Sequence, residues 1–105
     1  MTTANVKVHV AGSAVHISIA GEIDLANAGA VEDEVLAAVD NTATHVIMDL
    51  TDLMYIDSSG LRILFMLAGR LEVLQVRMQV VAPHGTPIHR VIELSGLDAL
   101  VELRS

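Results

Sequence analysis

The residues best suited to chemistry in this chain are Asp57, Ser58 and Ser59, which are followed by Gly60 and a long apolar run. Aspartate and serine favour the start of a helix, because their side-chain oxygens accept hydrogen bonds from its first free backbone N–H groups. We therefore predict a helix that begins at the two serines. A phosphate on a hydroxyl there would lie near free N–H donors and the positive end of the helix dipole. The alternative is that Ser58 or Ser59 is only a helix cap.

The predicted helix carries more apolar residues than one packing face needs. Arg62, Met66 and Arg70 recur on one side of it at intervals of four residues, which makes a mixed basic and apolar ridge. Such a ridge beside Ser58 is suited to docking another protein. In the alternative interpretation, Met66 fills the core and the two arginines pair with nearby acids.

The composition excludes several kinds of function. With 13 acidic and 6 basic residues, the chain has a formal charge of −7, which repels nucleic-acid phosphates and anionic membranes. The absence of cysteine excludes disulfides and thiolate chemistry. The first residues lack the pattern of a secretory signal, and no apolar run approaches the roughly 20 residues needed to cross a bilayer. We expect a cytoplasmic protein that neither binds nucleic acid directly nor inserts into a membrane.

Hydrophobic periodicity predicts the elements of the first half. Apolar residues alternate over 6–10 and 15–19, which predicts two antiparallel strands with His9 and His16 on their polar side. Asp24 is predicted to cap a helix that runs to about Val39 with Leu25 on its inner side. The nearly continuous apolar run of 45–50 predicts a strand buried on both faces.

The second half follows the same alternation of strands and helices. Residues 51–56 are expected to be a crossover, and 76–81 a strand. Thr86 and Pro87 predict the start of a short helix that ends at Gly96, with Leu94 facing inward. His84 and His89 are expected to be exposed. The tail, 97–103, is expected to form either a turn of helix or a short edge strand.

This order of elements predicts an α/β fold in one domain spanning residues 1–105. The sheet is expected to be mixed and mostly parallel, with four to five strands, an antiparallel hairpin at its start and three or more helices.

Enzyme chemistry has weak support in the sequence. No Gly-x-Ser-x-Gly turn is present, no histidine lies close to the serines in sequence, and Gly60 stands alone rather than in a phosphate-binding loop. A phospho-aspartate receiver could use aspartates at strand ends, but it would need a lysine on a late strand, and the only lysine is Lys7. We expect no catalytic residue, no metal site and no cofactor.

Four motifs together resemble a known family. They are Gly21-Glu22-Ile23-Asp24, the strand ending at Asp49-Leu50, Ile56-Asp57-Ser58-Ser59-Gly60-Leu61, and Leu94-Ser95-Gly96-Leu97. In this order they are similar to the anti-sigma-factor antagonists, whose fold is the STAS domain, and the resemblance covers essentially the whole chain.

The resemblance implies a bacterial switch protein without catalysis of its own. In that family, the unphosphorylated antagonist binds an anti-sigma factor that is also a serine kinase, and a sigma factor is released. The kinase, which holds ATP and magnesium, then phosphorylates the antagonist, and a serine phosphatase reverses the modification. The matching acceptor here is Ser58, with Asp24 and Asp57 as acidic neighbours and Ser59 and Gly60 shaping the helix start.

The resemblance also bears on the partner, and two alternatives to the switch protein remain. Arg62, Met66 and Arg70 become the expected partner contacts, and Arg62 stands where many family members carry glycine. One alternative is a STAS scaffold that does not switch, such as an accessory subunit of a transporter or signalling complex, in which Ser58 is only a cap. Another is an enzyme that uses Ser58 as a nucleophile.

Overall fold

The chain begins with a β-hairpin whose two strands run antiparallel. The computed structural model describes residues 3–105. Strand β1 (Ala4–Ala11) pairs with β2 (Ala14–Ile23) in a register that runs from Ala11 opposite Ala14 to Ala4 opposite Gly21. Gly12 makes the turn with a φ of 62°, a conformation that glycine adopts without strain. The predicted hairpin is confirmed, and His9 and His16 are both exposed.

The hairpin extends into one mixed sheet of six strands. Its main order is β1-β2-β3-β5-β6, with β3 at His45–Asp49, β5 at Arg77–Val81 and β6 at Glu102–Arg104. Every pairing after the hairpin is parallel. This confirms the predicted mostly parallel α/β sheet, and β6 shows that the tail ends as an edge strand after a short 3₁₀ turn, η1 (Leu97–Ala99).

One strand of the sheet was not predicted from the sequence. Residues Leu53–Ile56, expected to be a crossover, form β4, which pairs with the end of β2 rather than with β3. Leu53 and Ile56 are buried, whereas Met54 and Tyr55 between them are exposed. Because two exposed residues separate the buried ones, the run lacks the period of two by which a half-buried strand is recognised.

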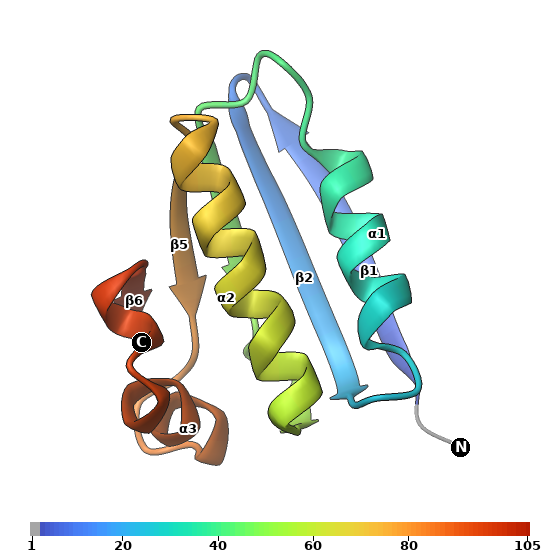
Figure 1. Ribbon diagram of the computed structural model, residues 1–105, viewed down its shortest axis with the longest axis vertical. Helices are drawn as coiled ribbons and strands as arrows, with labels where there is room; N and C mark the ends of the chain where they lie inside the picture. Colours follow the sequence, from blue (N-terminus) through green and yellow to red (C-terminus); the bar gives the residue numbers. More distant parts are fainter. Residues whose placement is uncertain (1–2) are drawn as a thin grey trace.

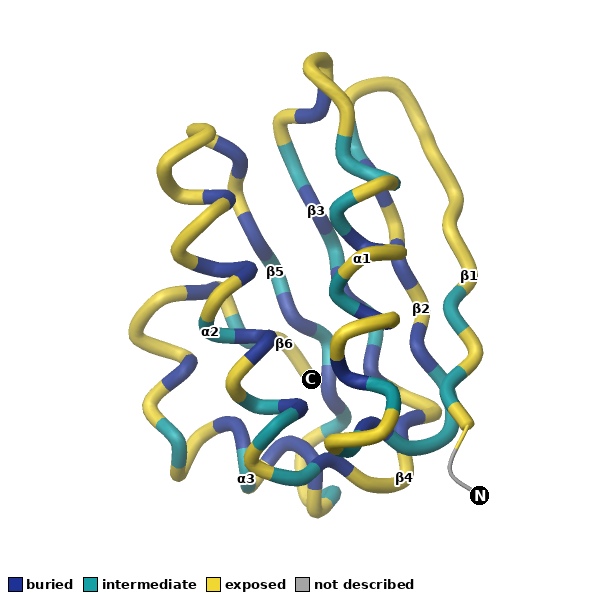
Figure 2. Tube along the Cα trace, turned by 45° about the vertical axis from the view of Figure 1, so that its right-hand side comes forward, coloured by how far each residue is buried: buried dark blue, intermediate teal, exposed yellow. Residues whose placement is uncertain are grey.

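Both long helices lie on the same face of the sheet. Helix α1 (Ala28–Ala38) and helix α2 (Ser58–Val73) run side by side in front of the strands (Figure 1). The strand residues facing them are buried, whereas His16 and Ser18, which alternate with the buried residues of β2, are exposed. Figure 2 shows this alternation of buried and exposed positions along β2. Strand β3 accordingly alternates buried and half-buried residues, so the prediction that it is buried on both faces was wrong. The continuous apolar sequence of β3 does not reveal that the two long helices lie on one face of the sheet and leave the other face of β3 half-buried.

Helix α1 starts later than predicted. Its N-terminal cap is Asn27 rather than Asp24, and Leu25 lies outside the helix with 79% of its surface exposed. After the helix, the Asp40 carboxylate accepts hydrogen bonds from the Thr42 hydroxyl and N–H at 2.7 and 2.8 Å. Both bonds lower the pKa of Asp40, and the bond from the Thr42 hydroxyl has the larger effect.

Helix α3 (Pro87–Ser95) follows its predicted boundaries. Thr86 caps it through a bond from the His89 N–H, and Gly96 ends it with a φ of 83°. The inward faces are Ile88 and Ile92, whereas Leu94 is 74% exposed, which contradicts its predicted position. Leu94 lies two residues beyond Ile92, and a step of two in a helix turns the side chain to the far side.

We expect Gly21→Ala to destabilise the protein by about 2–3 kcal/mol, because Gly21 has a φ of 98° and an added Cβ would lie 2.3 Å from the Thr3 carbonyl oxygen. The matched control is Gly69→Ala in α2, where an added Cβ meets nothing within 4 Å. That change should stabilise the helix by about 1 kcal/mol. Chemical denaturation of both variants measures the difference, and equal stabilities would contradict the assigned backbone conformation at Gly21.

Candidate functional site

The candidate site lies at the end of the molecule where β2 finishes and α2 begins. In Figures 1 and 2 the start of α2, the loop before α1 and helix α3 all lie at the lower end. The loop is fixed by its own side chains. The Asn27 side chain accepts a hydrogen bond from the Asp24 N–H at 2.9 Å and donates one to the Glu22 carbonyl at 2.8 Å.

Asp24 organises the same loop. Its Oδ1 accepts a hydrogen bond from the Ala26 N–H at 2.9 Å, and its carbonyl accepts one from the N–H of Ala28, the first residue of α1. The predicted capping role of Asp24 is therefore wrong in detail: its side chain closes a turn three residues before the helix. The half-buried Asp24 carboxyl is still part of the loop that faces the start of α2.

Asp57 joins this loop to α2. Its Oδ1 accepts a hydrogen bond from the Gly60 N–H at 3.0 Å, which makes Asp57 the N-terminal cap of the helix. Its Oδ2 accepts one from the Leu25 N–H at 3.1 Å, across 32 residues of sequence. The Asp57 N–H also donates to the Ile23 carbonyl at 3.2 Å. One residue thus caps the helix and holds the neighbouring loop.

Gly60 allows the first turn of α2 to press against the strands. A Cβ added at Gly60 would lie 2.5 Å from Cγ1 of Ile56 and 3.0 Å from Cγ2 of Ile23. The first distance is shorter than real Cβ contacts and the second is a tight one, so with any larger residue either the two isoleucine side chains or the helix start would have to shift. Gly60 therefore lets the helix start pack closely against β2 and β4.

Ser58 is the first residue of α2 and is exposed, whereas Ser59 is half-buried. Since Asp57 provides the cap, neither serine has the capping role that was the simplest alternative. In the described part of the chain no hydrogen bond engages the Ser58 hydroxyl, and none joins a histidine to it. The first amides of a helix have no intrahelical acceptor, so the Ser58 hydroxyl lies at an electropositive helix start.

The predicted ridge of Arg62, Met66 and Arg70 lies on the surface of α2. Both arginines are exposed and Met66 is 52% exposed, so Met66 is not core filler. Within the described residues neither arginine lies within ion-pair distance of a carboxylate; the one contact of this kind there brings His89 within 3.4 Å of Glu93. Met66 and Arg70 also line a groove of about 370 Å³ between α1 and α2, together with Glu32, Leu36, Phe65, Leu67 and Gly69.

Sequence reasoning missed the exposed apolar residues near the site. Leu25 and Met54 are 79% and 78% exposed, and Tyr55 is 49% exposed. Leu25 was assigned to the core because its position fits a helical stripe. The signal that it lies outside the helix is Asn27, whose amide can bond on both sides of the loop as it does here.

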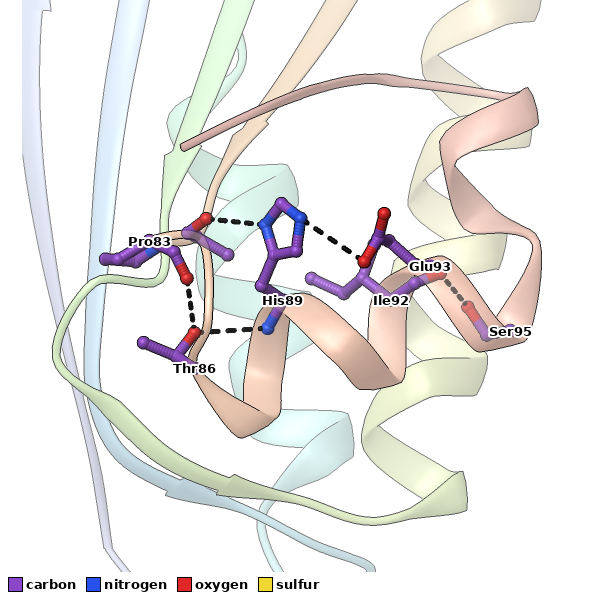
Figure 3. A network of polar contacts seen from close by, with 7 residues as sticks. Pro83, Thr86, His89, Ile92, Glu93 and Ser95 are labelled. Carbon is purple, nitrogen blue, oxygen red and sulfur yellow. Dashed lines mark hydrogen bonds and ion pairs between the residues drawn. The ribbon is translucent and has the colours of Figure 1, made fainter.

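A second polar cluster surrounds helix α3. His89, predicted to be exposed, is buried: its Nδ1–H donates to the Ala82 carbonyl at 2.8 Å, and its Nε2 lies 3.4 Å from Glu93 Oε1 (Figure 3). The Thr86 hydroxyl, which receives the His89 N–H, donates to the Pro83 carbonyl. The ring therefore attaches α3 to the end of β5. Among the described residues, no group of three or more histidine, aspartate or glutamate side chains is placed to hold a metal ion.

The comparison with family models agrees with this geometry. Residues 5–105 match the STAS domain, so the fold and the site define a STAS domain protein. In the described residues, no helix is long and apolar enough to cross a membrane.

Known relatives narrow the class. The chain is 36% identical over 78 residues to the "Putative anti-sigma factor antagonist BtrV" of Bordetella bronchiseptica, covering 72% of this chain but 65% of that protein, which is under two thirds of its length. It is 36% identical over 89 residues to the "Anti-sigma-F factor antagonist RsfB" of Mycobacterium tuberculosis, and the match covers 85% of this chain and 71% of that protein.

A solved structure supports the same assignment. The crystal structure of an anti-sigma factor antagonist from Mycobacterium paratuberculosis superposes with a TM-score of 0.81 at 30% identity, over 97% of this chain and 86% of that one. The chain belongs to the STAS domain family and, within it, to the anti-sigma factor antagonists. Proteins of this class are regulators rather than enzymes.

We expect Asp57→Ala to destabilise the protein by about 1–2 kcal/mol, the usual cost of removing a helix cap. Loss of the bond to Leu25 should also speed hydrogen exchange at the Leu25 and Gly60 amides. The control is Asp33→Ala in α1. Asp33 is exposed, so this substitution removes the same charge without removing a helix cap. Denaturation and amide exchange measure both effects, and unchanged exchange at Leu25 would show that the loop is held by other contacts.

Proposed function

We propose that this protein is an anti-anti-sigma factor that binds an anti-sigma factor with serine kinase activity when Ser58 is unmodified, and is released when Ser58 is phosphorylated. The observation that carries the proposal is the exposed Ser58 hydroxyl at a helix start already capped by Asp57. A serine in this position is open to a kinase, and the cap does not depend on it. ATP and magnesium belong to the kinase, a serine phosphatase restores the binding form, and the exchange takes place in the cytoplasm.

The electrostatics of the site favour release without refolding. Phosphorylation adds about −1.5 to −2 charge. The amides at the start of α2 and the helix dipole favour a negative group there, so the fold can hold the phosphate. Asp57 and the Asp24 loop lie beside it, in a chain whose formal charge is already −7.

At a partner interface the same charge is costly. Two unit charges of like sign about 4 Å apart repel by roughly 4 kcal/mol at an effective dielectric constant of 20. Half of that energy lowers the affinity more than tenfold, because about 1.4 kcal/mol corresponds to one decade. Steric and electrostatic exclusion is therefore sufficient for release, with little backbone change.

The ridge of Arg62, Met66 and Arg70 is the proposed contact surface for the anti-sigma factor. It begins one turn after Ser58 on the same helix, and its arginines have no internal ion pair among the described residues. Exposed Met66 can adapt to an apolar partner residue, since its side chain is unbranched. Although the protein has a formal charge of −7, these exposed guanidinium groups attract acidic partner side chains locally.

The switch is tested on Ser58 itself. Incubation with a cognate kinase and ATP should place one phosphate on Ser58, located by mass spectrometry, and Ser58→Ala should abolish it while Ser59→Ala retains it. Phosphorylated protein and Ser58→Glu should bind the anti-sigma factor at least about tenfold more weakly by calorimetry. Full binding after phosphorylation would instead favour the scaffold without a switch.

The contact surface is tested separately from the switch. Met66→Ala and Arg70→Ala should each weaken binding of the unphosphorylated protein by about 1–2 kcal/mol, because truncating a central interface residue removes both contact and desolvation. The control is Leu74→Ala, an exposed apolar residue at the other end of α2. Equal affinities for all three variants would place the interface elsewhere, even if Ser58 is phosphorylated.

A further inference from the structure

Over residues 3–105, no helix covers one face of the sheet, and this open face carries a row of opposite charges. Lys7 on β1 lies opposite Ser18 on β2, and Ser18 lies beside Asp49 on β3. Paired residues of neighbouring strands project from the same face, so an ammonium, a hydroxyl and a carboxylate stand side by side. Lys7 and Ser18 are exposed and Asp49 is half-buried.

This row borders a small hollow of about 110 Å³ on the open face. Residues from three strands and from the turn between β3 and β4 line it: Asn5, Lys7, Ser18, Ile19, Ala20, Asp49 and Asp52. Its volume is roughly that of three to four water molecules, at about 30 Å³ each. The hollow therefore has room for a molecule with only a few heavy atoms.

The charges around the hollow do not neutralise each other. Within the described residues Lys7, the only lysine of the chain, forms no ion pair with either aspartate. Asp49 is held in place because its Oδ1 accepts hydrogen bonds from the Thr51 N–H and hydroxyl, while its Oδ2 has no partner among the described residues. The ammonium group of Lys7 and the fixed carboxylate of Asp49 thus border one small hollow.

We propose that this hollow binds a small zwitterion, an α-amino acid of the size of alanine or serine. Lys7 receives its carboxylate, and Asp49 and Asp52 receive its ammonium group, with the Ser18 hydroxyl between them. Adjacent strands are about 4.8 Å apart, so Lys7 and Asp49 are separated by roughly 10 Å at the backbone. A molecule carrying both charges can pair with Lys7 and with the aspartates at once. A simple anion is repelled by the two carboxylates, and a simple cation is repelled by the Lys7 ammonium group.

The experiment is an NMR titration of the full chain, labelled with ¹⁵N, with L-alanine and L-serine. Acetate and methylammonium serve as controls, because each carries only one of the two charges of an amino acid. The expected result is a saturable shift of the Ser18, Ala20 and Asp49 amides with the amino acids alone. Lys7→Gln and Asp52→Asn should weaken binding at least tenfold, whereas Arg77→Gln, on the same face, and Glu34→Gln, on α1, should bind normally.

Three results would overturn the proposal. The first is no saturable shift up to about 10 mM amino acid, ten times the Kd of a millimolar ligand. The second is equal saturation by acetate or methylammonium. The third is normal binding by Lys7→Gln and Asp52→Asn, which would place the ligand elsewhere. Because the titration needs neither kinase nor anti-sigma factor, its outcome is independent of the switch at Ser58.

Discussion

The architecture of the site depends on the carboxylate of Asp57. One oxygen caps α2 through Gly60 and the other holds Leu25, so the start of the helix and the loop after β2 are fixed relative to each other. Without that bridge the two segments would be joined by the backbone bond from Asp57 to Ile23 and by the pairing of β4 with the end of β2. A carboxylate can do both because each of its oxygens accepts hydrogen bonds independently. The hydrogen bonds of Asp57 thereby position the exposed Ser58, the next residue in the chain.

The one-sided arrangement of helices divides the molecule into two surfaces with different chemistry. On the helical side the core is built from aliphatic strand residues under α1 and α2, and α2 carries the exposed Ser58 and the arginine ridge. On the other side the strands present polar and charged side chains to solvent. A partner on α2 and a small ligand on the open face would therefore not compete for space.

Much of this fold could be predicted from the sequence because local signals agree with the tertiary structure. Alternating valines and isoleucines gave the hairpin, Thr86 and Pro87 gave the start of α3, and Asp57 with the serines gave that of α2. The errors come from tertiary contacts. Leu25 fits a helical stripe, but its N–H is bound by Asp57 and it lies outside the helix. His89 is polar, but it is buried because its ring contacts the Ala82 carbonyl and Glu93. The residues of the site were predictable as a motif, but the double bonding of Asp57 was not, since Leu25 is distant in sequence.

The shared duty of Asp57 has an evolutionary consequence. Because its carboxylate supports both helix and loop whatever happens at the neighbouring hydroxyl, purifying selection on this aspartate should outlast selection on the serine. In lineages where this serine is replaced by alanine or another residue, the aspartate would remain for folding alone. Its presence in a distant homologue would then be a marker of ancestry and not of phosphorylation at the next residue.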